Sequence, residues 1–387
     1  MRSRKPFMIV CAAAAAAKRI VLAAVKFSDA DQKDPGLKTV YRDSFDVGCA
    51  VTVPVLSVPK LADLIKKQFN VITLENELKP DSVLDIEESR RCIERSGDET
   101  AAAVHFDQAK QILDFAQMNG LKVHGHTLLW HDQTPEEFFH ESYDLQRPFV
   151  SRDIMLGRME NYIRGVMEYL DSCYPGLIVS WDVVNEAVND EGTGLRESLW
   201  MTVVGEDYCR KAFEYTRKYA PEGTLLYCND YDTADPERRK VIIGLLKTLI
   251  SDGTIDSYGF QMHCSIGNID AEQISAALDE ISGLGLRLRI SEMDIAIEDD
   301  SESSYQAQAQ MYAKIMKILK EHSDQIEAVQ VWGIRDDLSW RKEKHPLLFD
   351  EKGEPKPAFY AFRDPDLFLQ DPQGTRTSAA QKSTNER

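Results

Sequence analysis

Two glutamates stand at the ends of apolar segments and could do chemistry together. Glu186 closes the segment Trp181-Asp-Val-Val-Asn-Glu186, and Glu292 closes Leu288-Arg-Ile-Ser-Glu292. Glycoside hydrolysis uses two carboxyl groups that lie close together. The protonated one acts as the acid, and the ionised one acts as the nucleophile or base. Tryptophans can stack on the C–H faces of sugar rings. The pattern therefore predicts a glycosidase site.

His124 and His126 support an alternative, because two histidines that flank one residue can ligate zinc. His263, Asp230 and Asp294 could complete such a site in a metal-dependent hydrolase. However, barrels of that kind usually carry the paired histidines on the first strand, and here they fall on the third. A sugar-binding barrel without activity is a further alternative, although loss of one of the two glutamates would be its signature.

The elements that must position these residues follow a regular alternation. Short apolar or β-branched runs alternate with segments of helical period, and helices are predicted from Ser57 onwards and over 106–118 and 151–170. Strands are predicted at 47–53, 71–74, 121–129, 178–184, 225–228, 258–262, 286–290 and 328–331. Eight such units predict an α/β fold, a closed (β/α)8 TIM barrel in a single domain. A doubly wound open sheet usually has a glycine-rich turn after its first strand, which this sequence lacks.

Polar and aromatic residues gather where the predicted strands end. Barrel enzymes place their chemistry at these carboxyl ends. The candidates are Glu75, Asn76, Lys79, His126, Trp130, Gln133, Asn185, Glu186, Tyr231, Gln261, His263, Glu292, Asp294, Trp332 and Trp340. A single strand end could be an ordinary surface loop, but this many together favour one functional site.

The composition limits the classes of binding partner that we expect. The chain has 387 residues, with 46 basic and 64 acidic side chains and a net charge of −18. That charge repels phosphate backbones and anionic lipid, so neither nucleic acid nor a membrane is an expected partner. The seven cysteines are scattered without a CxxC motif, which argues against a disulfide framework and a zinc site.

The barrel is predicted over residues 38–370. Residues 1–37 form an N-terminal extension, in which a basic start and an apolar run over 7–17 are typical of a secretion signal. Lys18 and Arg19 interrupt that run, so secretion and a cytoplasmic location both stay open. Residues 371–387 are predicted to be a disordered tail. The charge-rich segment 84–103 is interpreted as an insertion near the sugar-binding loop after the second strand.

The motifs resemble those of glycoside hydrolase family 10, the retaining endo-1,4-β-xylanases, over residues 45–362. The matching segments, in family order, are Ile72-Thr-Leu-Glu-Asn-Glu-Leu-Lys79, Gly125-His-Thr-Leu-Leu-Trp-His131, Trp181-Asp-Val-Val-Asn-Glu-Ala187, Asn229-Asp-Tyr231, Gln261-Met-His263, Ile290-Ser-Glu-Met-Asp294, Trp332-Gly-Ile-Arg-Asp-Asp-Leu-Ser-Trp340 and Pro346-Leu-Leu-Phe-Asp350. The departures are small: Pro80 stands where the family often has tryptophan, and Ser291 where it usually has threonine.

The resemblance implies a role for each matched residue. Glu186 would be the acid/base and Glu292 the nucleophile of a double displacement that cleaves xylan internally with retention, their carboxyl groups about 5–5.5 Å apart. His263, backed by Asp294, would orient Glu292, and Asn185 would hold the sugar 2-hydroxyl. The implied substrate-binding residues are Glu75, Asn76, Lys79, His126, Gln133 and Gln261, with Trp130, Trp332 and Trp340 as walls of the glycone side and Tyr231 nearer the leaving group. No metal or organic cofactor is implied, and the expected partners are xylan and xylo-oligosaccharides, bound by a monomer.

Overall fold

The computed structural model describes residues 34–372 of the chain. The predicted secretion signal and almost all of the predicted tail lie outside these residues. Among the residues described, no helix is both long and apolar enough to cross a membrane.

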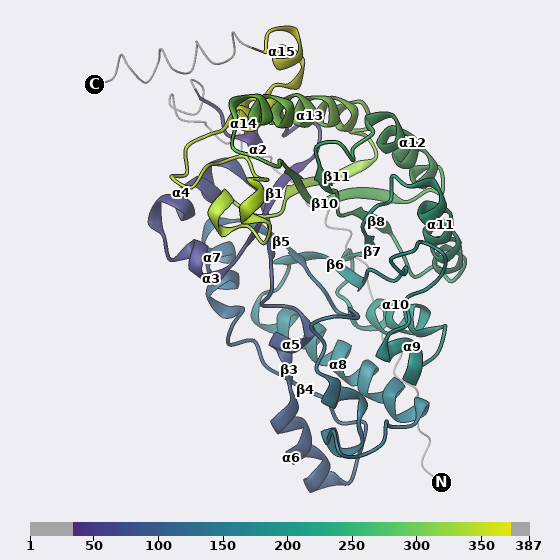
Figure 1. Cartoon of the computed structure of the whole chain (residues 1–387). Helices are drawn as coiled ribbons and strands as arrows, with labels where there is room; N and C mark the ends of the chain where they lie inside the picture. The colour runs from purple at the N-terminus through teal and green to yellow at the C-terminus, as the bar shows by residue number, and fades with distance from the viewer. Residues whose placement is uncertain (1–33, 373–387) are drawn as a thin grey trace, which may run out of the picture. The chain divides into compact units, whose positions relative to one another are not determined.

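Eight parallel strands close into a barrel (Figure 1). They are β1 (Asp46–Val51), β2 (Val71–Leu74), β5 (Lys122–Gly125), β6 (Ile178–Asn185), β7 (Leu225–Asp230), β8 (Ser257–Phe260), β10 (Arg287–Ala296) and β11 (Ile326–Val331). They pair in this order, and β11 returns to β1. This closure confirms the predicted TIM barrel. A short strand, β9 (His263–Ser265), pairs with the end of β10 beyond the ring.

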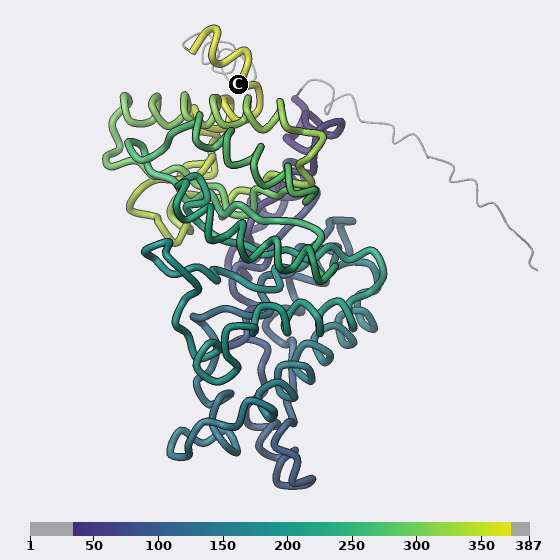
Figure 2. The backbone as a smooth tube through the Cα atoms, turned by 90° about the vertical axis from the view of Figure 1, so that its right-hand side faces the viewer, coloured from purple at the N-terminus to yellow at the C-terminus, as the bar shows by residue number. Residues whose placement is uncertain are grey.

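A helix follows each barrel strand and lies outside the sheet, as Figure 2 shows from the side. These helices are α4 (Pro59–Gln68), α7 (Lys110–Asn119), α8 (Arg152–Cys173), α10 (Tyr208–Tyr219), α11 (Pro236–Ser251), α12 (Ala271–Ser282), α13 (Glu302–Glu321) and α14 (Pro357–Arg363). The shorter helices are α2 (Leu37–Val40), α3 (Val53–Leu56), α9 (Leu199–Val203), α15 (Pro365–Gln370) and the 3-10 turns η1 (Glu136–Phe139), η2 (Glu141–Tyr143), η3 (Asp336–Leu338) and η4 (Lys342–Lys344).

Some predicted boundaries are wrong. Ser57 does not start a helix: it ends α3, its hydroxyl bonds back to the Val53 carbonyl, and α4 begins at Pro59. Proline fixes its own φ and lacks an N–H, which suits the first helical position. The helix predicted from 106 starts at Lys110 instead.

The segment 84–103 forms its own small unit beside α8. It contains α6 (Ile86–Ser96) and the antiparallel pair β3 (Leu84–Asp85) and β4 (Ala103–Val104), preceded by α5 (Pro80–Val83). In Figures 1 and 2, α6 projects away from the barrel. Buried Arg158 of α8 anchors the unit, since it pairs with Glu99 at 2.8 Å and donates to the carbonyls of Phe138 and His140.

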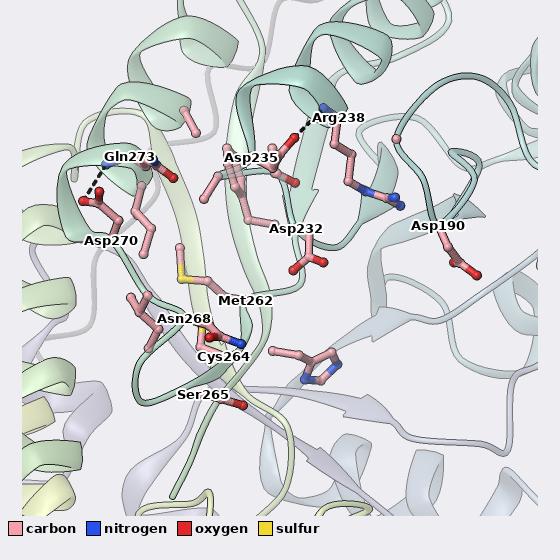
Figure 3. A pocket seen from close by; sticks show the side chains of 18 of the residues that line it. Asp190, Asp232, Asp235, Arg238, Met262, Cys264, Ser265, Asn268, Asp270 and Gln273 are labelled. Carbon is pink, nitrogen blue, oxygen red and sulfur yellow. Dashed lines mark hydrogen bonds between the residues drawn. The ribbon is translucent and has the colours of Figure 1, made fainter.

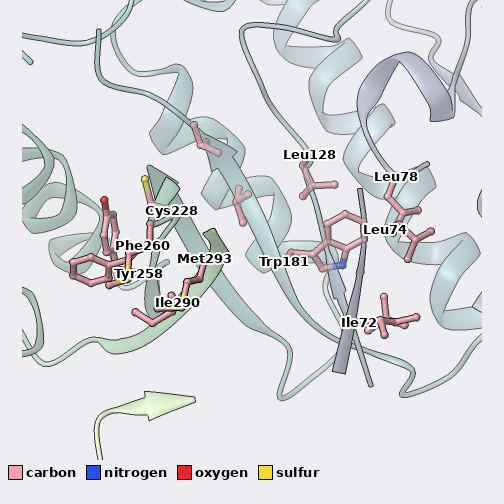
Figure 4. Close-up of a cluster of buried hydrophobic side chains, with 14 of the residues drawn as sticks. Ile72, Leu74, Leu78, Leu128, Trp181, Cys228, Tyr258, Phe260, Ile290 and Met293 are labelled. Carbon is pink, nitrogen blue, oxygen red and sulfur yellow. The ribbon is translucent and has the colours of Figure 1, made fainter. Parts of the chain in front are cut away.

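Strand β6 shows how the two faces of the sheet divide. Successive side chains of a strand point to opposite faces. Trp181 packs beside Leu74 and Leu128 in the apolar cluster between the sheet and the helices (Figure 4). Its neighbour Asp182 points the other way, toward His126, which directly follows the adjacent strand β5. The barrel is therefore apolar toward its helices, and polar groups collect inside, below the site.

We predict opposite stability effects for two glycine substitutions. A Cβ on Gly125 would lie 2.3 Å from the buried Trp181 ring, so Gly125→Ala should lower the free energy of unfolding by about 1–3 kcal/mol. Gly244, inside α11, has no atom within 4 Å of such a Cβ. Gly244→Ala should therefore raise it by roughly 0.5–1 kcal/mol through helix propensity. Urea unfolding monitored by circular dichroism measures both, and destabilisation by Gly244→Ala would contradict this account.

Candidate active site

The carboxyl ends of the strands surround a cavity of about 540 Å³. It is lined by Glu75, Asn76, Lys79, His126, Trp130, Gln133, Asn185, Glu186, Tyr231, Asp232, Gln261, His263, Glu292, Trp332, Trp340 and Arg341. Every predicted site residue is among them except Asp294, which is fully buried behind His263. Asp232 and Arg341 were not predicted. No residue of the segment 84–103 lines this cavity.

Glu292 is held on both carboxylate oxygens. Its side chain is only 5% exposed. Oε1 accepts from the Asn229 amide at 2.7 Å, and Oε2 lies 3.0 Å from Nε2 of His263. The other ring nitrogen of His263 lies 3.0 Å from Asp294. The glutamate is thus fixed in position by a neutral amide and an imidazole.

His263 is a cation between two carboxylates. Burial lowers its pKa, but Asp294 and Glu292 together outweigh burial and raise the pKa to about 10. Asp294 is fully buried and also accepts from Trp340 Nε1 at 2.9 Å and Arg341 Nη1 at 2.8 Å. A positive His263 stabilises the ionised form of Glu292, as a nucleophile requires.

Glu186 has different surroundings. It follows β6 with a left-handed backbone, φ 55°, and its N–H donates to the Asn229 carbonyl at 2.8 Å. Its carboxylate accepts from Trp130 Nε1 at 2.8 Å and from Gln261 Nε2 at 3.0 Å. His131 lies 3.8 Å away, and burial lowers the pKa of that histidine. The two side chains that donate to the carboxylate are therefore neutral, whereas Arg196 Nε donates to the backbone carbonyl of Glu186 at 3.3 Å.

Three side-chain amides connect the two glutamates. Asn185 Oδ1 accepts from Asn229 at 2.9 Å and from Gln261 at 3.2 Å. Asn229 also donates to Glu292, and Gln261 to Glu186. The relative position of the carboxylates is thus set by residues from four different strand ends.

The β2 end forms a polar wall. Lys79 is 6% exposed; its Nζ donates to Gln133 at 2.7 Å and to Asn76 at 3.2 Å, and lies 4.6 Å from the Trp130 ring centre. Burial lowers the pKa of Lys79. Burial also raises the pKa of Glu75 to about 7, although Lys79 opposes this. The wall therefore offers donors and acceptors with reduced charge, which suits sugar hydroxyls.

Asp182 lies under the cavity and contacts both predicted metal-binding histidines. Its carboxylate is 3.0 Å from His124 Nε2 and 2.9 Å from His126 Nδ1. Burial lowers the pKa of His124 to about 4, so that ring is neutral. Burial alone would raise the pKa of Asp182, but the two histidines hold it below its usual range. This contact orients the His126 ring, which packs edge-on against Trp332.

The ligands of the metal alternative do not converge. Asp230 is buried in an ion pair with Arg238 of α11. Ligand-capable atoms of His126, Asp182 and Glu292 do lie within 4.8 Å of one another. Each of these side chains, however, already has a hydrogen-bond partner in the protein. The arrangement favours a carboxylate pair over a metal centre.

A second cavity, of about 520 Å³, adjoins the first at His263 and Asp232. Figure 3 shows Asp232, Asp235 and Asp270 around it, at the amino ends of α11 and α12. Tyr231 stands at the border; its hydroxyl accepts from Arg196 at 2.8 Å. The cavity at the strand ends therefore continues into a second cavity at the amino ends of α11 and α12.

Sequence reasoning missed three residues of the network. Asn229 belongs to the motif Asn229-Asp-Tyr231 but has no predicted role, although its place in that motif was a signal. Asp182 could have been found as an acidic residue inside a buried strand. Arg341 follows Trp340 in an irregular loop, and no periodicity points to it.

The chain is also similar to known proteins. The model of glycosyl hydrolase family 10 matches residues 36–365. Endo-1,4-beta-xylanase B from Butyrivibrio fibrisolvens is 38% identical over 335 residues, which cover 84% of this chain and 52% of that protein. This chain thus spans about half the length of that relative.

Solved structures are also similar. An intracellular xylanase from Thermoanaerobacterium saccharolyticum matches with a TM-score of 0.77 at 35% identity, over 85% of this chain and 98% of that one. An endo-1,4-beta-D-xylanase from Clostridium thermocellum, complexed with xylohexaose, matches with a TM-score of 0.79 at 32% identity, over 85% of this chain and 67% of that one.

Across neutral pH, one histidine should stay positively charged and another should stay neutral. His263, with a pKa of about 10, should stay protonated from pH 5 to 8, and His124, with a pKa of about 4, should stay neutral. NMR of histidine-labelled protein checks this, with His263→Gln assigning one signal. The charged His263 stabilises the fold fully below the unfolded pKa of about 6.5, and this stabilisation is lost as the pH rises through about 10. A His263 signal that titrates near pH 6.5 would contradict the proposed ion pairs.

Proposed function

The chain belongs to glycosyl hydrolase family 10, and from this premise we propose that it is an endo-1,4-β-xylanase that hydrolyses internal bonds of xylan with retention. One observation carries the proposal: Glu186 and Glu292, from different strands, are connected through side-chain amides at one cavity, yet their surroundings differ. A carboxylate beside a cation and a carboxylate among neutral donors suit the nucleophile and the acid/base of a retaining glycosidase.

In the first step, Glu186 donates its proton to the glycosidic oxygen while a Glu292 oxygen attacks the anomeric carbon. The C–O bond to the leaving sugar breaks, and a glycosyl ester forms on Glu292. The His263 cation and the Asn229 amide hold Glu292 ionised and oriented for the attack. The aglycone leaves as a neutral alcohol.

In the second step, water replaces the aglycone. Glu292 is now an uncharged ester, so its repulsion of a charge on Glu186 has gone. Ionised Glu186 takes a proton from the water, and the water oxygen attacks the anomeric carbon from the face that the leaving group vacated. The bond between this carbon and the Glu292 oxygen breaks, which releases Glu292 as a carboxylate. Two inversions give retention, and both carboxyl groups return to their starting states.

Asn185 is our candidate for binding the 2-hydroxyl of the reacting sugar. Its Oδ1 already accepts from two amides, which leaves its N–H groups for the cavity. A hydrogen bond to that hydroxyl strengthens in the transition state. Glycone hydroxyls would bind the β2 wall, and Trp332 and Trp340 would contact the apolar faces of the sugars.

The proposed partners are xylan and xylo-oligosaccharides, bound by a monomer. The Clostridium thermocellum relative is solved with xylohexaose, which supports this substrate class. A β-glycosidase for short oligosaccharides is the second candidate, but two adjoining cavities favour a chain that extends past the catalytic pair. Secretion stays a prediction.

Hydrolysis of beechwood-type glucuronoxylan, with and without EDTA and beside carboxymethyl cellulose, tests the function. We expect a ladder of short xylo-oligosaccharides that the chelator does not change. Inactivity on both polymers, with activity on short oligosaccharides, would favour the second candidate. Loss of activity in EDTA would instead support a metal-dependent hydrolase.

Glu292→Ala should lower kcat by about 10⁴-fold or more, because no covalent ester can form. Added azide should restore part of the cleavage by attacking the anomeric carbon directly, and it should give a product of inverted configuration, measured by NMR. Glu298→Ala is the matched control, since that glutamate follows β10, the strand of Glu292, but is 72% exposed and, among the contacts described, pairs with Lys344. Substantial activity of Glu292→Ala without azide would show that the nucleophile is another group.

A further inference from the structure

We propose that Arg341 is a positioning residue for the nucleophile, acting through Asp294 and His263, and that its positive charge sets the acidic limit of activity. This inference rests on the function proposed above. Arg341 does not touch Glu292, so its effect must pass along the hydrogen bonds between them.

The contacts of Arg341 are directional and largely shielded from water. Its side chain is 19% exposed. Nη1 donates to Asp294 Oδ1 at 2.8 Å and to the Cys264 carbonyl at 2.9 Å, and Nη2 donates to Ser265 Oγ at 2.7 Å. The guanidinium thereby joins the loop after β11 to β9 and to β10. These are the strands that carry His263 and Glu292.

Asp294 leaves no oxygen unused. Oδ2 accepts from His263 and from the Trp340 indole, while Oδ1 accepts from Arg341. Among the contacts described, Arg341 is the one cation on the Oδ1 side of this fully buried carboxylate. Removal of Arg341 would leave Oδ1 without that partner. A buried charge that loses its partner is costly, so Asp294 and the ring that it orients would move or rehydrate.

The charges alternate along this path. Glu292 is negative, His263 positive, Asp294 negative and Arg341 positive, so the four groups together are neutral. Removal of Arg341 leaves a net negative charge around Glu292. Because a net negative charge attracts protons to this part of the site, activity should be lost at a higher pH when the solution is acidified.

Other charged or titratable groups face the same region and do not change in this comparison. Lys79 and Glu75 act on Glu292 from the β2 end, Asp232 lines the cavity with Arg341, and Cys264 and Tyr312 lie near Asp294. The set is therefore Glu75, Lys79, Glu186, Asp232, His263, Cys264, Glu292, Asp294 and Tyr312, with His126 and Asp182 next to Glu292.

The experiment compares kcat and KM of wild type, Arg341→Met and Arg341→Lys on a soluble aryl β-xylobioside across the pH range. We expect the acid limb of kcat/KM to move up by about one pH unit in Arg341→Met and to stay near wild type in Arg341→Lys, which keeps the charge. Because Arg341 acts on the nucleophile, kcat should fall more than KM rises. Equal limbs in all three proteins, or equal shifts in the Met and Lys variants, would overturn the proposal.

Arg335→Met is the matched control, because Arg335 lies in the same loop but pairs with Asp337 outside the cavity. Its acid limb should equal that of wild type, and a shift as large as that of Arg341→Met would also overturn the proposal. Thermal unfolding verifies that each variant is folded. If wild type does not cleave the xyloside, the proposed function fails, but the Arg341 contact is still tested by NMR: loss of the cation should raise the His263 titration, and an unchanged titration would overturn it.

Discussion

The rest of the site depends on keeping a charged Glu292 in a place where it is almost removed from water. An isolated buried carboxylate is costly, and it persists only with hydrogen bonds and opposite charge around it. The protein supplies these from separate elements: an amide from Asn229 on β7, an imidazole from His263 on β9 and, behind it, Asp294 on β10. Each partner is itself held by another group, which is why the network spreads across the barrel mouth.

The barrel is what makes such a network attainable. Parallel strands bring their carboxyl ends to one rim, so residues far apart in sequence become neighbours. Successive side chains of β6 point to opposite faces of the sheet. Trp181 therefore packs in the apolar layer, and Asp182 lies in the barrel interior, where it orients His126. Close packing below the rim restricts which residues fit there: a side chain on Gly125 would collide with the Trp181 ring. The chemistry at the top therefore rests on a tightly filled lower layer.

The barrel could be predicted from the sequence, because it depends on short-range patterns, and the polar residues at the predicted strand ends line one cavity. Apolar period and polar strand ends placed Glu186 and Glu292 on the same rim, and the cavity contains both. Helix starts were less predictable, since Pro59 overrides the capping preference of Ser57. Arg341 could not be predicted, because its partners Asp294 and Cys264 come from other strands and its own loop has no period. Whatever depends on tertiary pairing of an irregular loop is invisible in one sequence.

The two glutamates differ in the way their proposed tasks require. A nucleophile should be ionised when it attacks, and Glu292 lies against a cation and is 5% exposed. An acid/base must gain and lose a proton in each cycle, and Glu186 is more accessible, at 16%, with the neutral donors Trp130 and Gln261 on its oxygens. A cation bonded to the Glu186 carboxylate itself would hold it ionised and oppose its first task. Because the amide network joins the two carboxylates without adding charge, it can fix their separation and leave their different electrostatic surroundings intact.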